Sequence, residues 1–234
     1  MNNKYIELIN NFINGKLNIT DLNTSSYNYS FYNSAIDILN ELNINRLFYN
    51  DVTKILSKSK YNDIFIEMMK NIKTELLYKS HCHGLNHNIR VALFALIICV
   101  NEDISLEDFI IIIEGAKYHD IGRENDLTDD SHGKRSAMKM DFLKDEYSNE
   151  ELNLLKTIVT CHSIDDEYFD SVAKKNNIKD IDRCRKMYNI LKDSDALDRV
   201  RLDDPTIKIN LMRTTTAKEL IPFAYEMYES YIKY

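Results

Sequence analysis

The most constraining feature of this sequence is its shortage of chain-turning residues, since 234 residues contain 5 glycines and 2 prolines. Sheet proteins built from many hairpins need far more of them, because tight turns use backbone conformations that glycine and proline supply. Apolar residues recur at helical spacing along much of the chain, and we find no convincing pair of alternating strand patterns. We therefore predict an all-α helical bundle.

Composition and charge indicate a globular protein and argue against several other classes of protein. Hydrophobic residues make up 44% of the chain and charged residues 29%, which is typical of a globular protein with one large core. The net charge of −7 argues against extended nucleic-acid binding and against an anionic membrane surface. The longest apolar run, residues 91–100, is about half of what a membrane span needs. With no visible signal peptide and no CxxC spacing among the four cysteines, we expect a cytoplasmic protein with reduced thiols.

The periodic pattern divides the chain into two parts. Residues 1–60, rich in Asn, Tyr and Ser, predict an N-terminal helical extension packed on the core, and residues 61–234 predict the main domain. Ser105 is expected to cap one helix, and Ser148 with Glu151 forms a capping-box pattern at the start of another. The other expected helices cover residues 5–13, 30–47, 106–118, 181–192, 195–201 and 216–232.

The doublet His119-Asp120 is the first candidate site. It ends an apolar helix, and Gly122 would let the chain leave that helix immediately afterwards. An imidazole and a carboxylate side by side can reach one metal ion or two neighbouring ones. For the doublet alone, a capped helix end with a solvated aspartate is a credible alternative.

Two further residues have the surroundings of a buried metal ligand. His87 shares a helical face with Val91 and Phe94, so its imidazole is expected to point inward beside apolar packing. A buried neutral imidazole with an open nitrogen is what a divalent ion needs. Asp195 stands in an otherwise apolar helical context, and the alternative for it is a helix N-cap.

The ordered set formed by His87 with Arg90-Val91, the doublet His119-Asp120 and the late Asp195 resembles the HD-domain metal-dependent phosphohydrolases. The resemblance covers about residues 61–234, which would then form an HD domain. The stretches 119–123 and 132–137 resemble the small stand-alone bacterial hydrolases of that family in particular. The resemblance implies an all-α fold whose central helices hold one or two divalent ions. It also implies hydrolysis of a nucleotide or a small phosphate ester, with a metal-bound hydroxide as nucleophile.

Some HD branches hold a second metal with two intervening histidines, and His132 and His162 fall in that interval. Six candidate ligands result: His87, His119, Asp120, His132, His162 and Asp195. Asp120 would bridge the two ions and serve as a catalytic residue. Alternatively, His132 contacts the substrate and His162 supports the site from outside. Imidazole and carboxylate ligands without thiolate suit Mn, Fe, Co, Ni or Mg.

Cationic residues near these ligands are candidates for binding phosphate. Arg123 is the best of them, because the break at Gly122 would direct it over the site, and it is expected to be catalytic as well. Further candidates are Lys134, Arg135 and Arg199, with Arg213 a weaker one. His81 and His83 are expected at the surface or behind the ligands. Asp165 and Asp166 are expected to cap a helix, and the alternative is that they orient a ligand histidine.

Two other functions use the same residues. An HD fold with six such ligands can hold a mixed-valent di-iron pair that activates oxygen, and a non-catalytic sensor or binding protein can retain the fold. The leading prediction remains a phosphohydrolase that binds and hydrolyses a small phosphorylated metabolite or a nucleotide. The sequence contains no indication of oligomeric state.

Overall fold

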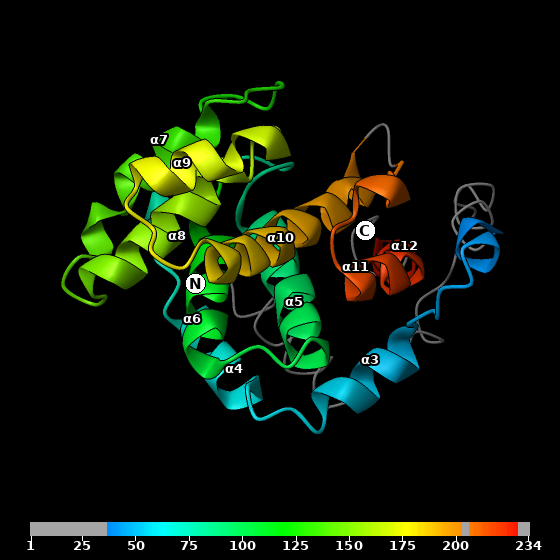
Figure 1. Ribbon diagram of the computed structural model, residues 1–234. Helices are drawn as coiled ribbons and strands as arrows, with labels where there is room; N and C mark the ends of the chain where they lie inside the picture. The colour runs from blue at the N-terminus through cyan, green and yellow to red at the C-terminus, as the bar shows by residue number, and fades with distance from the viewer. Residues whose placement is uncertain (1–36, 203–205, 229–234) are drawn as a thin grey trace.

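A computed structural model describes residues 37–202 and 206–228 of the chain. Within these ranges all regular structure is helical, which confirms the predicted all-α fold (Figure 1). In chain order the α-helices that follow residue 48 are α3 (Tyr49–Leu56), α4 (Asn62–Lys70), α5 (Leu85–Asn101), α6 (Leu106–Tyr118), α7 (His132–Lys139), α8 (Asn149–Cys161), α9 (Phe169–Lys175), α10 (Ile181–Leu197), α11 (Thr215–Glu219) and α12 (Ile221–Met227). The predicted helix at residues 5–13 lies outside the described residues.

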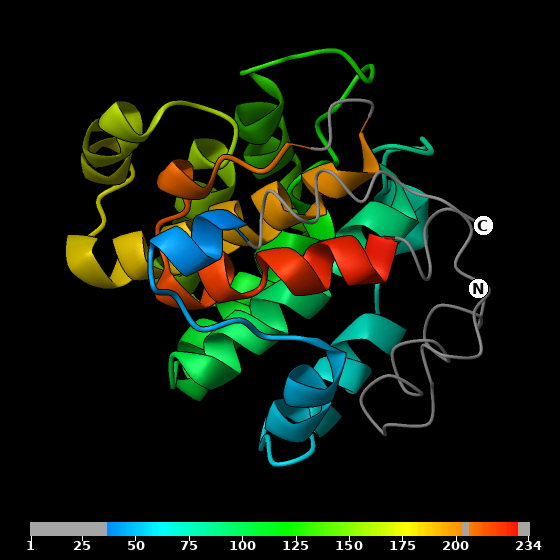
Figure 2. The same cartoon turned by 90° about the vertical axis from the view of Figure 1, so that its right-hand side faces the viewer.

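Four helices form the centre of the bundle. α5, α6, α8 and α10 pack on one another, with α7 and α9 against α8. On the other side, α11 and α12 lie beside α5 and the end of α10 (Figures 1 and 2). Residues 91–99 of α5 are buried on every side, so the longest apolar run of the sequence is the central core helix. Among the described residues, no helix has the length and apolarity needed to span a bilayer.

Local capping signals are confirmed at two helix starts. The Ser105 hydroxyl accepts a hydrogen bond from the backbone N–H of Asp108 at 3.2 Å. At α8, the Ser148 hydroxyl accepts from the N–H of Glu151, and the Glu151 carboxylate accepts from the N–H of Ser148 at 2.8 Å. Both caps satisfy donors that a helix N-terminus leaves without partners, which fixes where these helices begin.

The predicted helix at residues 30–47 is wrong over residues 42–47, and residues 30–36 lie outside the described part of the chain. Residues 37–41 are helical, but Asn43 adopts a left-handed backbone with φ of 51°. The N–H of Ile44 then bonds the carbonyl of Leu39 at 3.0 Å, which is the hydrogen bond of a helix-ending Schellman turn. Asparagine tolerates this conformation better than most residues, so the chain turns here and starts again at α3.

The later helices are also divided differently from the prediction. The two helices expected at residues 181–192 and 195–201 are one helix, α10, followed by the 3₁₀ turn η5 (Asp198–Arg201). Asp195 therefore lies inside a helix and is not an N-cap. The helix expected at residues 216–232 breaks between α11 and α12, because Pro222 in the first turn of α12 starts a new helix.

Residues 47–56 pack directly on the core. The N–H of Leu47 bonds the carbonyl of Glu219 at 2.9 Å, and Val52 and Leu56 of α3 are fully buried where α3 meets α5. The same apolar core continues from Tyr49 to Met227 among the described residues. The division into an extension at 1–60 and a domain at 61–234 stays a prediction.

Candidate metal centre

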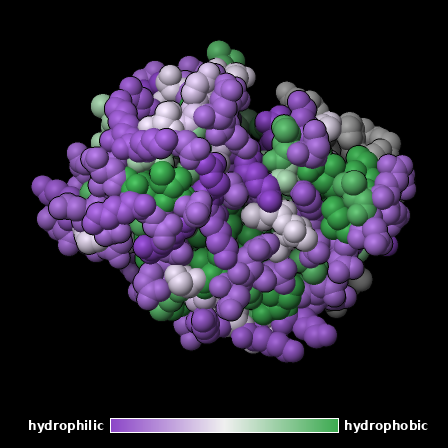
Figure 3. Space-filling model, viewed as in Figure 1, coloured by the Kyte–Doolittle hydropathy of each residue, from purple (hydrophilic) through white to green (hydrophobic). Residues whose placement is uncertain are grey.

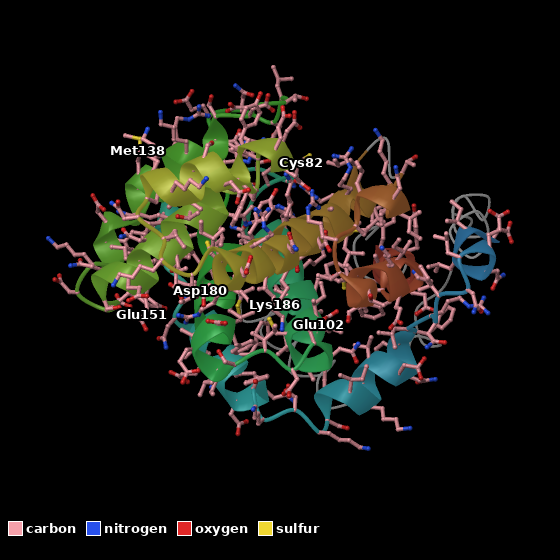
Figure 4. The ribbon with its side chains drawn as sticks, viewed as in Figure 1. Cys82, Glu102, Met138, Glu151, Asp180 and Lys186 are labelled. Atoms are coloured by element: carbon pink, nitrogen blue, oxygen red, sulfur yellow. The ribbon has the colours of Figure 1, made fainter. Side chains whose placement is uncertain are left out.

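The six predicted ligands lie together at one end of the bundle, where five helices begin or end. They are His87 in the first turn of α5, His119 and Asp120 just after α6, His132 at the start of α7, His162 just after α8, and Asp195 in the last turn of α10. Glu102 follows α5 and Asp180 precedes α10, and both lie at the other end of the bundle (Figure 4). Helix packing thus gathers ligands that are far apart in sequence.

The first ligand group contains His87, His119, Asp120 and Asp195. The Nε2 atom of His87 lies 3.0 Å from Nε2 of His119, 3.5 Å from Oδ2 of Asp120 and 3.2 Å from Oδ1 of Asp195. The Nε2 atom of His119 is 3.7 Å from the same Asp120 oxygen and 3.8 Å from the same Asp195 oxygen. The ligand atoms of His87, His119 and Asp120 therefore lie within 4.8 Å of one another, and Asp195 forms an adjoining group of the same kind with His119 and His162.

The second ligand group contains Asp120, His132 and His162. The Nε2 atoms of the two histidines are 2.9 Å apart, and they lie 3.1 and 3.7 Å from Oδ1 of Asp120. Asp120 therefore turns one carboxylate oxygen toward each group, which is the position of a bridging ligand. His132 and His162 are buried, as are His87, His119 and Asp120.

The Nδ1 atom of each of the four histidines faces a hydrogen-bond acceptor. His119 and His162 are paired with the carbonyls of Ala116 and Val159, three residues earlier, at 3.0 and 2.6 Å. His132 is paired in the same way with the carbonyl of Asp129, and His87 with a carboxylate. Each ring then carries its proton on Nδ1, which leaves the Nε2 lone pairs pointing at one another. Lone pairs of two neutral rings about 3 Å apart repel, so each pair of rings fits a positive charge between its Nε2 atoms, either a metal ion or, at His87 in the metal-free chain, a proton.

Asp120 gives independent support for a bound cation. Both of its oxygens are buried and lack a hydrogen-bond donor among the described residues. The Nε atom of Arg123 lies 3.0 Å from Oδ1 but is not aligned for a hydrogen bond. A buried carboxylate without donors is costly by several kcal/mol, and metal coordination removes that cost. The buried His/Asp groups can hold a metal ion.

Metal binding is expected to release a proton. In the metal-free chain, burial and Arg201 favour a neutral His87, but Asp120, Asp195 and Asp198 outweigh them and raise its pKa to about 9. Burial lowers the pKa of His119 to about 3, so that ring is already neutral. Below about pH 9 a metal ion must displace the His87 proton in order to bind. We therefore expect the apparent Kd of the metal ion to fall about tenfold for each unit by which the pH rises between roughly pH 6 and 8. Calorimetric titration with Mn²⁺ across this range tests it, and a pH-independent Kd would contradict it.

An ion-paired cluster lies behind His87. Asp198 Oδ2 accepts the Nδ1–H of His87 at 2.7 Å, and Arg90 Nε and Nη2 donate to the same carboxylate at 2.6 and 3.0 Å. Arg201 Nη1 lies 3.3 Å from it. The spacing could have indicated this pairing, because Arg90 and Asp198 each follow a ligand by three residues and so share its helical face.

His83 belongs to the surroundings of the site, and His81 is exposed. The ring of His83 is buried and packs edge-on against that of His87, with the centroids 5.7 Å apart. Its Nδ1 atom lies 2.8 Å from Asp126 Oδ1, which also accepts from the Ser80 hydroxyl at 2.7 Å. Burial lowers the pKa of His83. The structure thus places His83 behind a predicted ligand, one of the two positions expected for it.

The predicted phosphate-binding cations occupy different environments. Arg123 contacts Asp120, as described above, whereas the side chains of Lys134 and Arg199 are exposed. Arg135 donates to the carbonyl of Gly122 at 2.9 Å and to the carboxylate of Asp129. Its guanidinium therefore holds the 122–129 loop. This arrangement does not support the predicted contact between Arg135 and a substrate. The substrate contacts predicted for Arg123, Lys134 and Arg199 stay predictions.

A pocket of about 320 Å³ opens beside Asp195 and His162. Its other walls carry four cations and several apolar side chains, and the cations are Lys192, Arg199, Lys208 and Arg213. In the space-filling view, hydrophilic side chains border a notch between the α7–α9 region and the segment that follows α10 (Figure 3). The side chain of Asp195 is 31% exposed, unlike the other ligands, so the site is reached from this side.

The predicted helix-capping role of Asp165 and Asp166 is wrong. Asp165 precedes the 3₁₀ turn η4 (Asp166–Tyr168) without a side-chain cap. Asp166 instead accepts hydrogen bonds from Tyr188, Lys192 and Arg213, at 2.6, 2.8 and 2.7 Å respectively. These bonds tie η4 to α10 and to the segment before α11.

Gly122 is required for close packing. A Cβ atom there would lie 2.2 Å from the Ser136 nitrogen and 2.5 Å from the His132 carbonyl oxygen, both backbone atoms of α7. We expect Gly122→Ala to lower the free energy of unfolding by about 1–3 kcal/mol and to weaken metal binding, because α7 carries His132. Denaturant titration and metal titration measure the two effects. Gly115→Ala is the control, since its nearest contact is a Leu191 methyl group at 3.3 Å, and an equal loss there would contradict the explanation.

Comparison of the chain with protein-family models, with curated proteins and with solved structures gives no match.

Proposed function

We propose that this chain is a metal-dependent phosphohydrolase acting on a nucleotide or a small phosphate ester. The observation that carries the proposal is the convergence of six His and Asp side chains, among which Asp120 turns its two oxygens toward two separate ligand groups. This is the set that the resemblance to HD-domain phosphohydrolases implies.

The residues fit two neighbouring ions. His87, His119, Asp120 and Asp195 would hold one, and His132 and His162 would hold the other with Asp120 shared between them. Nitrogen and carboxylate ligands without thiolate favour Mn, Fe, Co, Ni or Mg. When bound, such ions would lower the pKa of a water molecule and offset the charge of phosphoryl oxygens.

The protein groups around the ligands support an anionic substrate. Arg123 lies against Asp120 and would hold that carboxylate in place while directing positive charge toward the site. The pocket beside Asp195 is lined by cations and apolar side chains, which suits the remainder of a phosphorylated molecule. The catalytic role of Asp120 and Arg123 is part of the proposal.

Metal content and activity test the proposal together. The chain would be purified without chelator, analysed for bound metals, and assayed on a panel of phosphate esters and nucleotides before and after chelation. We expect about two ions per chain and hydrolysis that chelation removes and metal restores. Iron with oxygen consumption and no hydrolysis would favour the di-iron oxygenase alternative. No metal after reconstitution would overturn the enzyme proposal in favour of a binding protein.

A further inference from the structure

Two of the four cations in the pocket beside Asp195 are already paired. The guanidinium of Arg213 lies 3.0 Å from Asp193 and 2.7 Å from Asp166, and the ammonium of Lys192 lies 2.8 Å from Asp166. These two charges are neutralised by protein carboxylates. Their role is to join α10, η4 and the segment before α11 into one wall.

The other two cations are exposed in the pocket and form no ion pair with any described residue. Arg199 stands one helical turn after the ligand Asp195, and Lys208 lies on the segment that faces it across the pocket. No side-chain hydrogen bond links either cation to the part of the chain that the structure covers. The pocket therefore has two positive charges without an ion pair to any described residue, in a protein whose net charge is −7.

The segment that carries Lys208 is held in a defined position. Asp193, which is fully buried in α10, accepts hydrogen bonds from the backbone N–H groups of Arg213 and Thr214 at 2.9 and 2.7 Å. The Thr214 hydroxyl donates to the same carboxylate at 3.0 Å. Lys208 thus extends from a wall anchored to α10, the helix that directly precedes the η5 turn carrying Arg199. A preorganised pair of cations binds an anion without having to order the wall first.

We propose that the substrate carries a second phosphate group, which binds to Arg199 and Lys208 while the phosphate to be hydrolysed lies at the ligand cluster. This rests on the proposed function. Two such cations match the charge of one phosphate dianion, and Arg can bind phosphate with two parallel hydrogen bonds. The apolar side chains of Ile207 and Met212, which line the same pocket, suit the carbon part of the molecule. The substrate class is a small bisphosphorylated compound.

Kinetics with a matched pair of nucleotides tests this inference. Wild-type protein would be assayed with a nucleoside 5′-monophosphate and with the 3′,5′-bisphosphate of the same nucleoside. We expect kcat/KM to be about 10–100-fold higher for the bisphosphate, the usual range for hydrogen bonds to a charged group. Arg199→Ala and Lys208→Ala should each lower this ratio about tenfold, with Arg199→Lys intermediate. Lys54→Ala, on α3, is the control and should leave the ratio unchanged.

Kinetic and calorimetric binding measurements together distinguish failure of the second phosphate site from failure of the proposed hydrolase function. Equal kcat/KM values for the two wild-type reactions, or variants that leave the ratio unchanged, would overturn the second phosphate site while hydrolysis itself still stands. If no nucleotide is hydrolysed, calorimetry with the same pair on the metal-loaded chain decides. Tighter binding of the bisphosphate that Arg199→Ala removes would keep the phosphate site without the enzyme, and equal binding would reject both. A nucleoside 5′-phosphate with a 3′-carboxylate arm shows whether a single negative charge is enough.

Discussion

Asp120→Asn should remove nearly all metal-dependent hydrolysis. The two Asp120 oxygens face separate ligand groups, 3.5 Å from His87 Nε2 and 3.1 Å from His132 Nε2. An amide keeps the shape but loses the charge, and it turns an NH₂ group toward one of the two ions. We expect bound metal to fall from about two ions to one or fewer. We also expect kcat/KM to fall about 1000-fold, which corresponds to losing several kcal/mol of charge stabilisation in the transition state.

Elemental analysis and steady-state kinetics measure these two effects, and a stability measurement shows whether the variant is folded. Asp145→Asn, at an exposed aspartate without an ion pair to any described residue, is the matched control. A variant that keeps both ions and full activity would show that Asp120 does not bridge the two groups.

Asp198→Asn should weaken both the fold and the metal site. The carboxylate is fully buried and binds His87, Arg90 and Arg201 at once. Loss of its charge leaves the partly buried guanidinium of Arg90 without this counterion, which is expected to lower the free energy of unfolding by about 3–5 kcal/mol. The orientation and basicity of His87 also depend on this carboxylate, so metal affinity should fall about 10–100-fold. Denaturant unfolding and metal titration provide the two values, again with Asp145→Asn as control.

The pH dependence of the same cluster has a defined direction. Burial raises the pKa of Asp198, but Arg90, His87 and Arg201 outweigh burial and lower it to about 2. An unfolded aspartate has a pKa of about 3.9. The ionised cluster therefore stabilises the fold above about pH 4, and this contribution is lost as the pH falls toward 2. Between about pH 4 and pH 2, the free energy of unfolding should therefore fall less in Asp198→Asn than in the wild type. An equal fall in the two proteins would reject this explanation.

The local features of the fold could be read from short stretches of sequence. Ser105 and Ser148 cap the helices that were expected of them, because a cap depends on donors and acceptors within three residues. The error at residues 42–47 has a local cause as well. Asn43 enters the left-handed region, which the sequence permits but does not require. The continuity of α10 was missed because Asp193 and Asp195 read as polar interruptions, whereas packing against the 213–214 segment and the histidines accommodates both.

The candidate site was predictable as a set of residues but not as an arrangement. His87, His119, Asp120, His132, His162 and Asp195 were all named from the sequence, and the described structure brings them together. Their tautomers were not predictable, since each depends on which acceptor lies beside Nδ1. In the sequence, Arg135 and Arg199 are both cations near a predicted ligand. Only the structure shows that Arg135 holds a loop whereas Arg199 lines a pocket.

The sequence by itself determined the all-α fold, the starts of α6 and α8, and the identity of the His and Asp side chains available to a metal ion. These properties depend on residues within about one helical turn, and neighbours along the chain supply them. The tertiary structure decided which oxygen of Asp120 faces which histidines, the support of His87 by Asp198, and the two cations across the pocket. His87 and Asp198 are separated by 111 positions in the sequence. Their contact exists only because α5 and α10 pack together, and that packing is a property of the whole core.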